Sequence, residues 1–197
     1  MKLTDISGVT EISGEGIKKH FKNIEPLQAV FELVWNGLDA RANLVQVSIQ
    51  ENELGGIELV SISDDGDGID PTTLKDTFGK FYDSHKKENA ALHGAHGRGR
   101  LAFHRVCNRA IWHTKSASGQ ARILVEAGNI KRFSANLITP DLQSEKLKNH
   151  TSGTLVELDQ FNDKLPKGSD LRNKFSVEFG WYLALHPKKK ITINSVP

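Results

Sequence analysis

Residues 25–41 read EPLQAVFELVWNGLDAR, and the rest of the sequence is best interpreted outward from this stretch. Pro26 suits the first turn of a helix, where its missing N–H costs no hydrogen bond. Apolar residues recur at helical spacing and form one face: Leu27, Val30, Phe31, Val34 and Leu38. This pattern predicts an amphipathic helix over 25–41 whose apolar face packs on a core.

A polar stripe runs along the other side of this helix. At about 100° per residue, Glu32, Asn36 and Asp39 fall within about 60° of one another. A solvated face is the ordinary interpretation of such a stripe. However, no Lys or Arg stands four residues from the carboxylates, although surface helices often carry such pairs. Trp35, Ala29 and Ala40 flank the stripe, so we expect something to cover it.

Beyond the helix, alternating and β-branched segments predict strands over 44–50, 57–63, 110–116, 121–127, 130–138, 153–159 and 191–194. Asp70-Pro71 predicts the start of a short helix. Residues 101–108 and 169–185 are also predicted to be helical. Helices and strands segregate without a steady βαβ rhythm, so the fold class expected is α+β.

Three further motifs lie outside the first helix. Asp64-Asp65-Gly66-Asp67-Gly68 ends a strand; it could be a simple turn, but the ligand spacing of a calcium loop does not fit it. Gly94-Ala95-His96-Gly97-Arg98-Gly99-Arg100 precedes a predicted helix, where backbone N–H groups can bind phosphate. It is not a Walker A loop, and the dinucleotide fingerprint would need a preceding strand. Ser152-Gly153-Thr154 leads into a strand.

The composition excludes several other classes of protein. The chain has 197 residues, 38% of them hydrophobic and 25% charged, which is typical of one soluble domain. A net charge of +2 gives no argument for binding nucleic acid or a membrane surface. Cys107 is the single cysteine, so no intramolecular disulfide can form, and we expect a cytoplasmic protein. His93 and His96 have no partners spaced for a zinc site.

In their order, the four motifs resemble the ATP site of the superfamily of gyrase, heat-shock chaperones, histidine kinases and MutL (GHKL). Glu32-x-x-x-Asn36-x-x-Asp39-Ala40 resembles the first motif and Asp64-x-Gly66-x-Gly68 the second. Gly94-x-x-Gly97-x-Gly99 resembles the third, and Gly153-Thr154 the fourth. The resemblance covers about residues 15–160, and its first two motifs look most like MutL and the heat-shock chaperone. No phosphoacceptor helix precedes them, so kinase activity is not expected.

The resemblance implies a two-layer α/β sandwich with helices over a mixed, largely antiparallel sheet. It also implies an ATP lid at about residues 79–99. By this resemblance Glu32 is the general base, Asn36 binds Mg²⁺, and Asp39 belongs to the ATP site. Asp64 would accept the adenine amino group, with Gly66 and Gly68 leaving room for the base. The phosphate cradle would be formed by Gly94, Gly97, Arg98, Gly99 and Arg100, and Thr154 would hold adenine through water.

The function expected is therefore Mg²⁺-dependent ATP binding and hydrolysis, with lid closure controlling homodimerisation or a neighbouring domain. The alternative is a non-catalytic nucleotide-binding or interaction domain, and the presence of Glu32 favours the ATPase. The chain is expected to be one domain at the N-terminus of a longer protein. Nucleic acid would be bound only through other domains, and hydrolysis by residues 1–197 alone should be slow.

Overall fold

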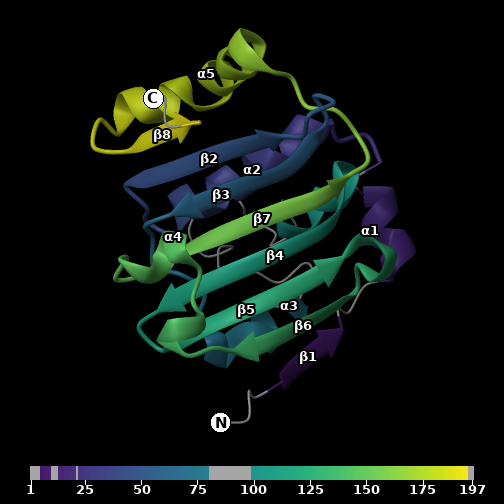
Figure 1. The fold of residues 1–197 in the computed structure, drawn as a ribbon, viewed down its shortest axis with the longest axis vertical. Helices are drawn as coiled ribbons and strands as arrows, with labels where there is room; N and C mark the ends of the chain where they lie inside the picture. Colours follow the sequence, from purple (N-terminus) through teal and green to yellow (C-terminus); the bar gives the residue numbers. More distant parts are fainter. Residues whose placement is uncertain (1–4, 10–12, 21, 80–98, 195–197) are drawn as a thin grey trace.

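The computed structural model describes residues 5–9, 13–20, 22–79 and 99–194. A single sheet runs through these residues in the order β1-β6-β5-β4-β7-β3-β2-β8 (Figure 1). Neighbouring strands are antiparallel except β2 and β8, which are parallel. The strands are β1 (Asp5–Val9), β2 (Leu44–Glu51), β3 (Ile57–Asp64), β4 (Cys107–Ser116), β5 (Gly119–Glu126), β6 (Arg132–Leu137), β7 (Gly153–Phe161) and β8 (Lys190–Ile193).

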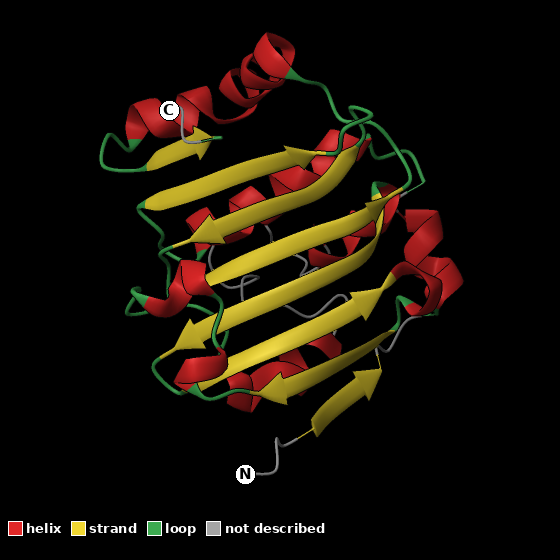
Figure 2. Cartoon of the chain, viewed as in Figure 1, coloured by secondary structure: helices red, strands yellow, loops and turns green. Residues whose placement is uncertain are grey.

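The α-helices are α1 (Gly14–His20), α2 (Pro26–Asp39), α3 (Leu74–Gly79), α4 (Glu145–Lys148) and α5 (Gly168–Leu185). Helices α2 and α3 lie behind the sheet in the view of Figure 2 and form the second layer, whereas α5 runs along the edge at β8. The short 3₁₀ segments are η1 (Pro71–Thr73), η3 (Gly99–Arg105), η4 (Ala127–Asn129) and η5 (Pro140–Leu142). The expected two-layer α/β sandwich with a mixed, largely antiparallel sheet is confirmed.

The core lies between α2 and the sheet. Val30 and Val34 of α2 are almost fully buried, as are Val45 of β2 and Val60 and Ile62 of β3. The alternation of β2 explains its contribution, since every second residue of a strand points to the same face. The amphipathic pattern of residues 25–41 therefore specifies which side of α2 meets the sheet.

One predicted helix is wrong. Residues 101–108 were expected to be helical, but the structure has a 3₁₀ segment over Gly99–Arg105, and β4 begins at Cys107. The Val106 N–H donates to the Phe103 carbonyl, an i→i−3 bond that ends the segment. Cys107 then pairs with Phe161 of β7, so sheet pairing outcompetes local helix propensity. The sequence patterns also did not predict β1, α1 or α4.

Candidate nucleotide site

The first motif lies on α2, and its polar stripe is half-buried. Glu32, Asn36 and Asp39 have intermediate exposure, whereas Trp35 between them is only 8% exposed. The helix ends at Asp39, and the N–H of Ala40 donates to the carbonyl of Asn36. The stripe is therefore not fully exposed to solvent, because neighbouring segments of the chain lie close to it.

Asp64 is the most buried carboxylate of the four motifs. It is the last residue of β3 and is 7% exposed, and its Oδ1 accepts a hydrogen bond of 2.9 Å from the N–H of Gly66. Burial raises the pKa of Asp64 to about 6, although hydrogen bonds from the backbone of Gly66 and Thr154 act in the opposite direction. A buried carboxylate of this kind can accept a hydrogen bond from a ligand amine.

Glycines allow three segments of backbone to pack around Asp64. A Cβ on Gly37 of α2 would lie 3.0 Å from the Cβ of Asp64, and one on Gly66 would lie 2.5 Å from the carbonyl oxygen of Ala40. A Cβ on Gly153 would clash with the Asp64 carbonyl oxygen. A Cβ at Gly66 or Gly153 would collide with backbone, and one at Gly37 would be tightly packed, because the first, second and fourth motifs touch there.

Thr154 reaches Asp64 through strand register. The two residues are direct partners in the antiparallel pairing of β3 with β7, and Thr154 is buried. Asp64 and Thr154, 90 positions apart in sequence, are therefore neighbours where β3 ends and β7 begins. The register places the second and fourth motifs side by side.

Thr114 is a buried residue of this region that sequence reasoning missed. Its hydroxyl accepts a 2.6 Å hydrogen bond from the N–H of Ile69, directly after the second motif. Gly68 has φ of +73°, and a Cβ there would clash with the carbonyl of Lys115. Thr114 and Lys115 of β4 thus hold the turn in place. No sequence motif includes Thr114, so its role could be recognised only from its position in the sheet.

The other two carboxylates of the second motif stabilise the turn. Asp65 accepts hydrogen bonds of 2.8 and 2.9 Å from the N–H groups of Asn43 and Leu44. Asp67 pairs with Arg41 at 2.7 Å, with both side chains largely exposed. Of the three aspartates in this stretch, only Asp64 is buried. Asp65 and Asp67 thus make contacts that stabilise a turn, and Asp64 differs from them in being buried.

The third motif meets the first at Glu32. A Cβ built on Gly99, the first residue of η3, would clash with Oε2 of Glu32. The next residue, Arg100, places its guanidinium 5.3 Å from the centre of the Phe78 ring, and burial lowers its pKa to about 10. Gly94, Gly97 and Arg98 lie outside the described residues, as does most of the predicted lid.

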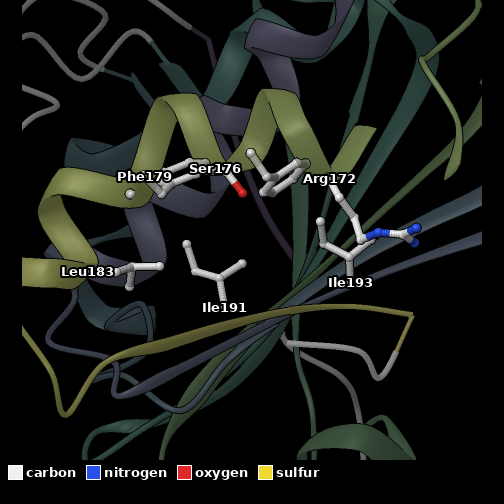
Figure 3. A pocket seen from close by; sticks show the side chains of 8 residues that line it. Arg172, Ser176, Phe179, Leu183, Ile191 and Ile193 are labelled. Atoms are coloured by element: carbon white, nitrogen blue, oxygen red, sulfur yellow. The ribbon is translucent and has the colours of Figure 1, made fainter. Parts of the chain in front are cut away.

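A small apolar pocket lies elsewhere, between α5 and β8. It has a volume of about 160 Å³, and Figure 3 shows Phe179, Leu183, Ile191 and Ile193 around it. No residue of the four motifs lines it. The described residues contain no cluster of three or more His, Cys, Asp or Glu side chains suited to a metal, and no helix among them could cross a bilayer.

The arrangement of the motifs agrees with the comparison to known protein families. Residues 24–154 match the family described as histidine kinase-, DNA gyrase B- and HSP90-like ATPase. Because the match covers most of the chain, this protein belongs to that ATPase family. The GHKL resemblance drawn from the four motifs is confirmed.

Within the family, this chain is similar to MutL proteins. It is 25% identical over 184 residues to the DNA mismatch repair protein MutL of Halalkalibacterium halodurans, covering 90% of this chain and 28% of that protein. For MutL of Lactobacillus delbrueckii subsp. bulgaricus the identity is 30% over 113 residues, 55% of this chain and 17% of that one. For MutL of Clostridium botulinum the identity is 35% over 79 residues, which cover 40% of this chain and 10% of that protein. The chain thus spans little more than a quarter of these curated relatives at most.

Proposed function

We propose that the chain binds ATP with Mg²⁺ and hydrolyses it. The observation that carries this proposal is the buried Asp64 carboxylate, enclosed by Gly37, Gly66 and Gly153. A carboxylate accepts hydrogen bonds, so it would bind the exocyclic amine of adenine and would repel the carbonyl oxygen that guanine carries at that position. Thr154, its register partner, would support the base through its hydroxyl.

The polar stripe of α2 supports the chemical step. Glu32 would orient and deprotonate the attacking water, since a carboxylate within hydrogen-bond reach serves as a general base. Asn36, one helical turn later, offers a single amide oxygen, which fits Mg²⁺ because this ion is usually held by few protein ligands and by substrate phosphates. When bound, the ion would neutralise charge on the phosphates. Asp39 lies on the same stripe and would extend the site's polar lining.

The phosphates would contact the start of η3. Gly99 brings the backbone of the third motif against Glu32, and backbone N–H groups of Gly99 and Arg100 are suited to phosphate oxygens. Gly94, Gly97 and Arg98 belong to this proposal on sequence grounds. Lid closure over residues 79–99, homodimerisation and control of a neighbouring domain likewise rest on the sequence and the family.

Turnover by residues 1–197 is expected to be slow. Phosphoryl transfer normally needs a cation besides Mg²⁺ to stabilise the transition state. Arg100 is the cation of the third motif among the described residues, and its guanidinium lies over the ring of Phe78. In the phosphate cradle, Arg100 would contact ATP and the transition state alike, and a group that binds both equally does not raise turnover.

Calorimetry with purified protein tests the proposed function. Mg-ATP should bind with a stoichiometry of one, and Mg-GTP should bind at least about ten-fold more weakly because guanine presents a carbonyl oxygen to Asp64 where adenine presents its amine. Steady-state release of phosphate under saturating Mg-ATP then tests hydrolysis. Equal affinity for the two nucleotides would contradict the adenine assignment, and binding without measurable release would favour the non-catalytic alternative.

A further inference from the structure

Helix α5 lies beyond the 24–154 range of the family match, yet it packs directly on the helix that carries the first motif. The contact is aromatic. Phe175 and Phe179 meet Phe31 with ring centres 5.0 and 5.4 Å apart, and Trp35 lies 4.8 Å from Phe179 and 5.1 Å from Tyr182. Because both Phe31 and Trp35 belong to α2, α5 contacts α2 over more than one turn.

A directed polar contact accompanies this packing. The indole Nε1–H of Trp35 donates a 2.8 Å hydrogen bond to Oε1 of Glu178, which lies on α5 143 residues further along the chain. Trp35 is almost buried and Glu178 half-buried, so water competes little for this bond. Burial and, to a lesser extent, the charge of Asp39 raise the pKa of Tyr182, the α5 residue whose ring also packs on Trp35.

The hydrogen bond constrains α2 in a way that apolar packing does not. Apolar contacts are non-directional, so they tolerate small rotations of a helix about its axis. A hydrogen bond is directional and weakens steeply when its angle changes. Trp35 stands between Glu32 and Asn36 in the sequence, and a rotation that moves its indole moves both polar side chains as well.

We propose that Glu178 is a positioning residue, which fixes the rotation of α2 through Trp35 and so aims Glu32 and Asn36 at the nucleotide. The inference rests on the proposed ATPase function. It adds to the four motifs a fifth element, α5, that acts on turnover and contacts no part of the nucleotide. Its effect should appear in kcat, because misplacing a base and a metal ligand costs more in the transition state than in the bound ground state.

Three variants separate positioning from simple stability. Glu178→Ala removes the acceptor and should lower kcat for ATP about three- to ten-fold, with the Kd for a non-hydrolysable Mg-ATP analogue within two-fold of wild type. Glu178→Gln keeps an acceptor oxygen and should retain at least half of wild-type kcat. Asn173→Ala, at an exposed position of the same helix, is the matched control and should leave kcat unchanged.

A second readout does not depend on turnover. The protein has three tryptophans, so a ¹⁵N-labelled sample gives three indole N–H signals, and a Trp35→Phe variant identifies the one from Trp35. That signal should move in Glu178→Ala, stay near its wild-type position in Glu178→Gln, and shift when the Mg-ATP analogue binds. The melting temperature of each variant confirms that it is folded at the assay temperature.

The outcomes are distinct. If wild-type protein binds no Mg-ATP, the proposed function and this inference fail together. If wild-type protein hydrolyses ATP and folded Glu178→Ala hydrolyses it at the same rate, only the positioning role is overturned. A Glu178→Gln variant as slow as Glu178→Ala would also overturn it, since the hydrogen bond would then not be the cause.

Discussion

Gly99 lies so close to Glu32 that the carboxylate of Glu32 occupies the space a Cβ on Gly99 would need. The two residues come from the third and first motifs, 67 positions apart. This contact joins the half-buried polar stripe of α2 to the segment proposed to bind phosphate. Glu32 is therefore held beside η3, which is where a general base for an attack on phosphorus would be needed.

A methyl group at Gly99 should displace Glu32. We expect Gly99→Ala to lower the turnover of ATP at least ten-fold, because misplacement of about 1 Å at a reacting group is costly. Gly128→Ala is the matched control, since nothing lies within 4 Å of a Cβ built there. Phosphate release from both variants, with circular dichroism to verify folding, measures the effect; equal turnover in the two would contradict it.

Replacing the base itself should separate binding from chemistry. We expect Glu32→Ala to bind Mg-ATP as wild type does and to lose turnover by ~10²-fold or more, the usual contribution of a general base. Glu58→Ala, on the exposed side of β3, is the control for removing one negative charge. A Glu32→Ala variant that hydrolyses ATP at the wild-type rate would show that Glu32 is not the general base.

Asp64 should decide whether adenine binds. Mg-ATP should raise the melting temperature of the wild-type protein, because a ligand that binds only the folded state stabilises it. In Asp64→Asn this increase should disappear, since the amide can present a donor where an acceptor is needed. Asp65→Asn is the neighbouring control. Unchanged ATP affinity in Asp64→Asn by calorimetry would remove Asp64 from the site.

Asp64→Asn should weaken the stabilisation by ATP, but without nucleotide it should raise the free energy of unfolding relative to wild type as the pH increases. Burial raises the pKa of Asp64 from 3.8 to about 6, so the folded state holds a proton that the unfolded state has already lost between these values. The stability contributed by this proton is present at low pH and is lost as pH rises through about 6. The side-chain amide of the Asp64→Asn variant does not ionise, so the variant avoids this loss.

Urea denaturation at pH 5 and pH 8 measures this difference. The stability of Asp64→Asn relative to wild type should be greater at pH 8 than at pH 5 by about 1 kcal/mol, from the proton linkage of one carboxyl. Other titrating groups are common to both proteins and cancel in the comparison. A pH-independent difference would mean that the pKa of Asp64 is not raised in the folded protein.

Much of the fold could be predicted from short-range pattern. The apolar spacing of Leu27, Val30 and Val34 predicts α2, and the alternation around Val45 and Val47 predicts β2, because these periods follow directly from backbone geometry. The 3₁₀ segment before Cys107 could not be predicted this way. There the pairing of β4 with β7 limits the helix, and that pairing depends on residues more than 50 positions away.

By itself, the sequence determined the four motifs, their order and the family to which the chain belongs. The positive φ of Gly68, a conformation that favours glycine, became evident only in the structure. Only the tertiary structure decided that Gly99 abuts Glu32, that Thr154 pairs with Asp64, and that Glu178 binds Trp35. The physical reason is that these contacts depend on strand register and helix packing, which join residues through space and leave no local period in the sequence.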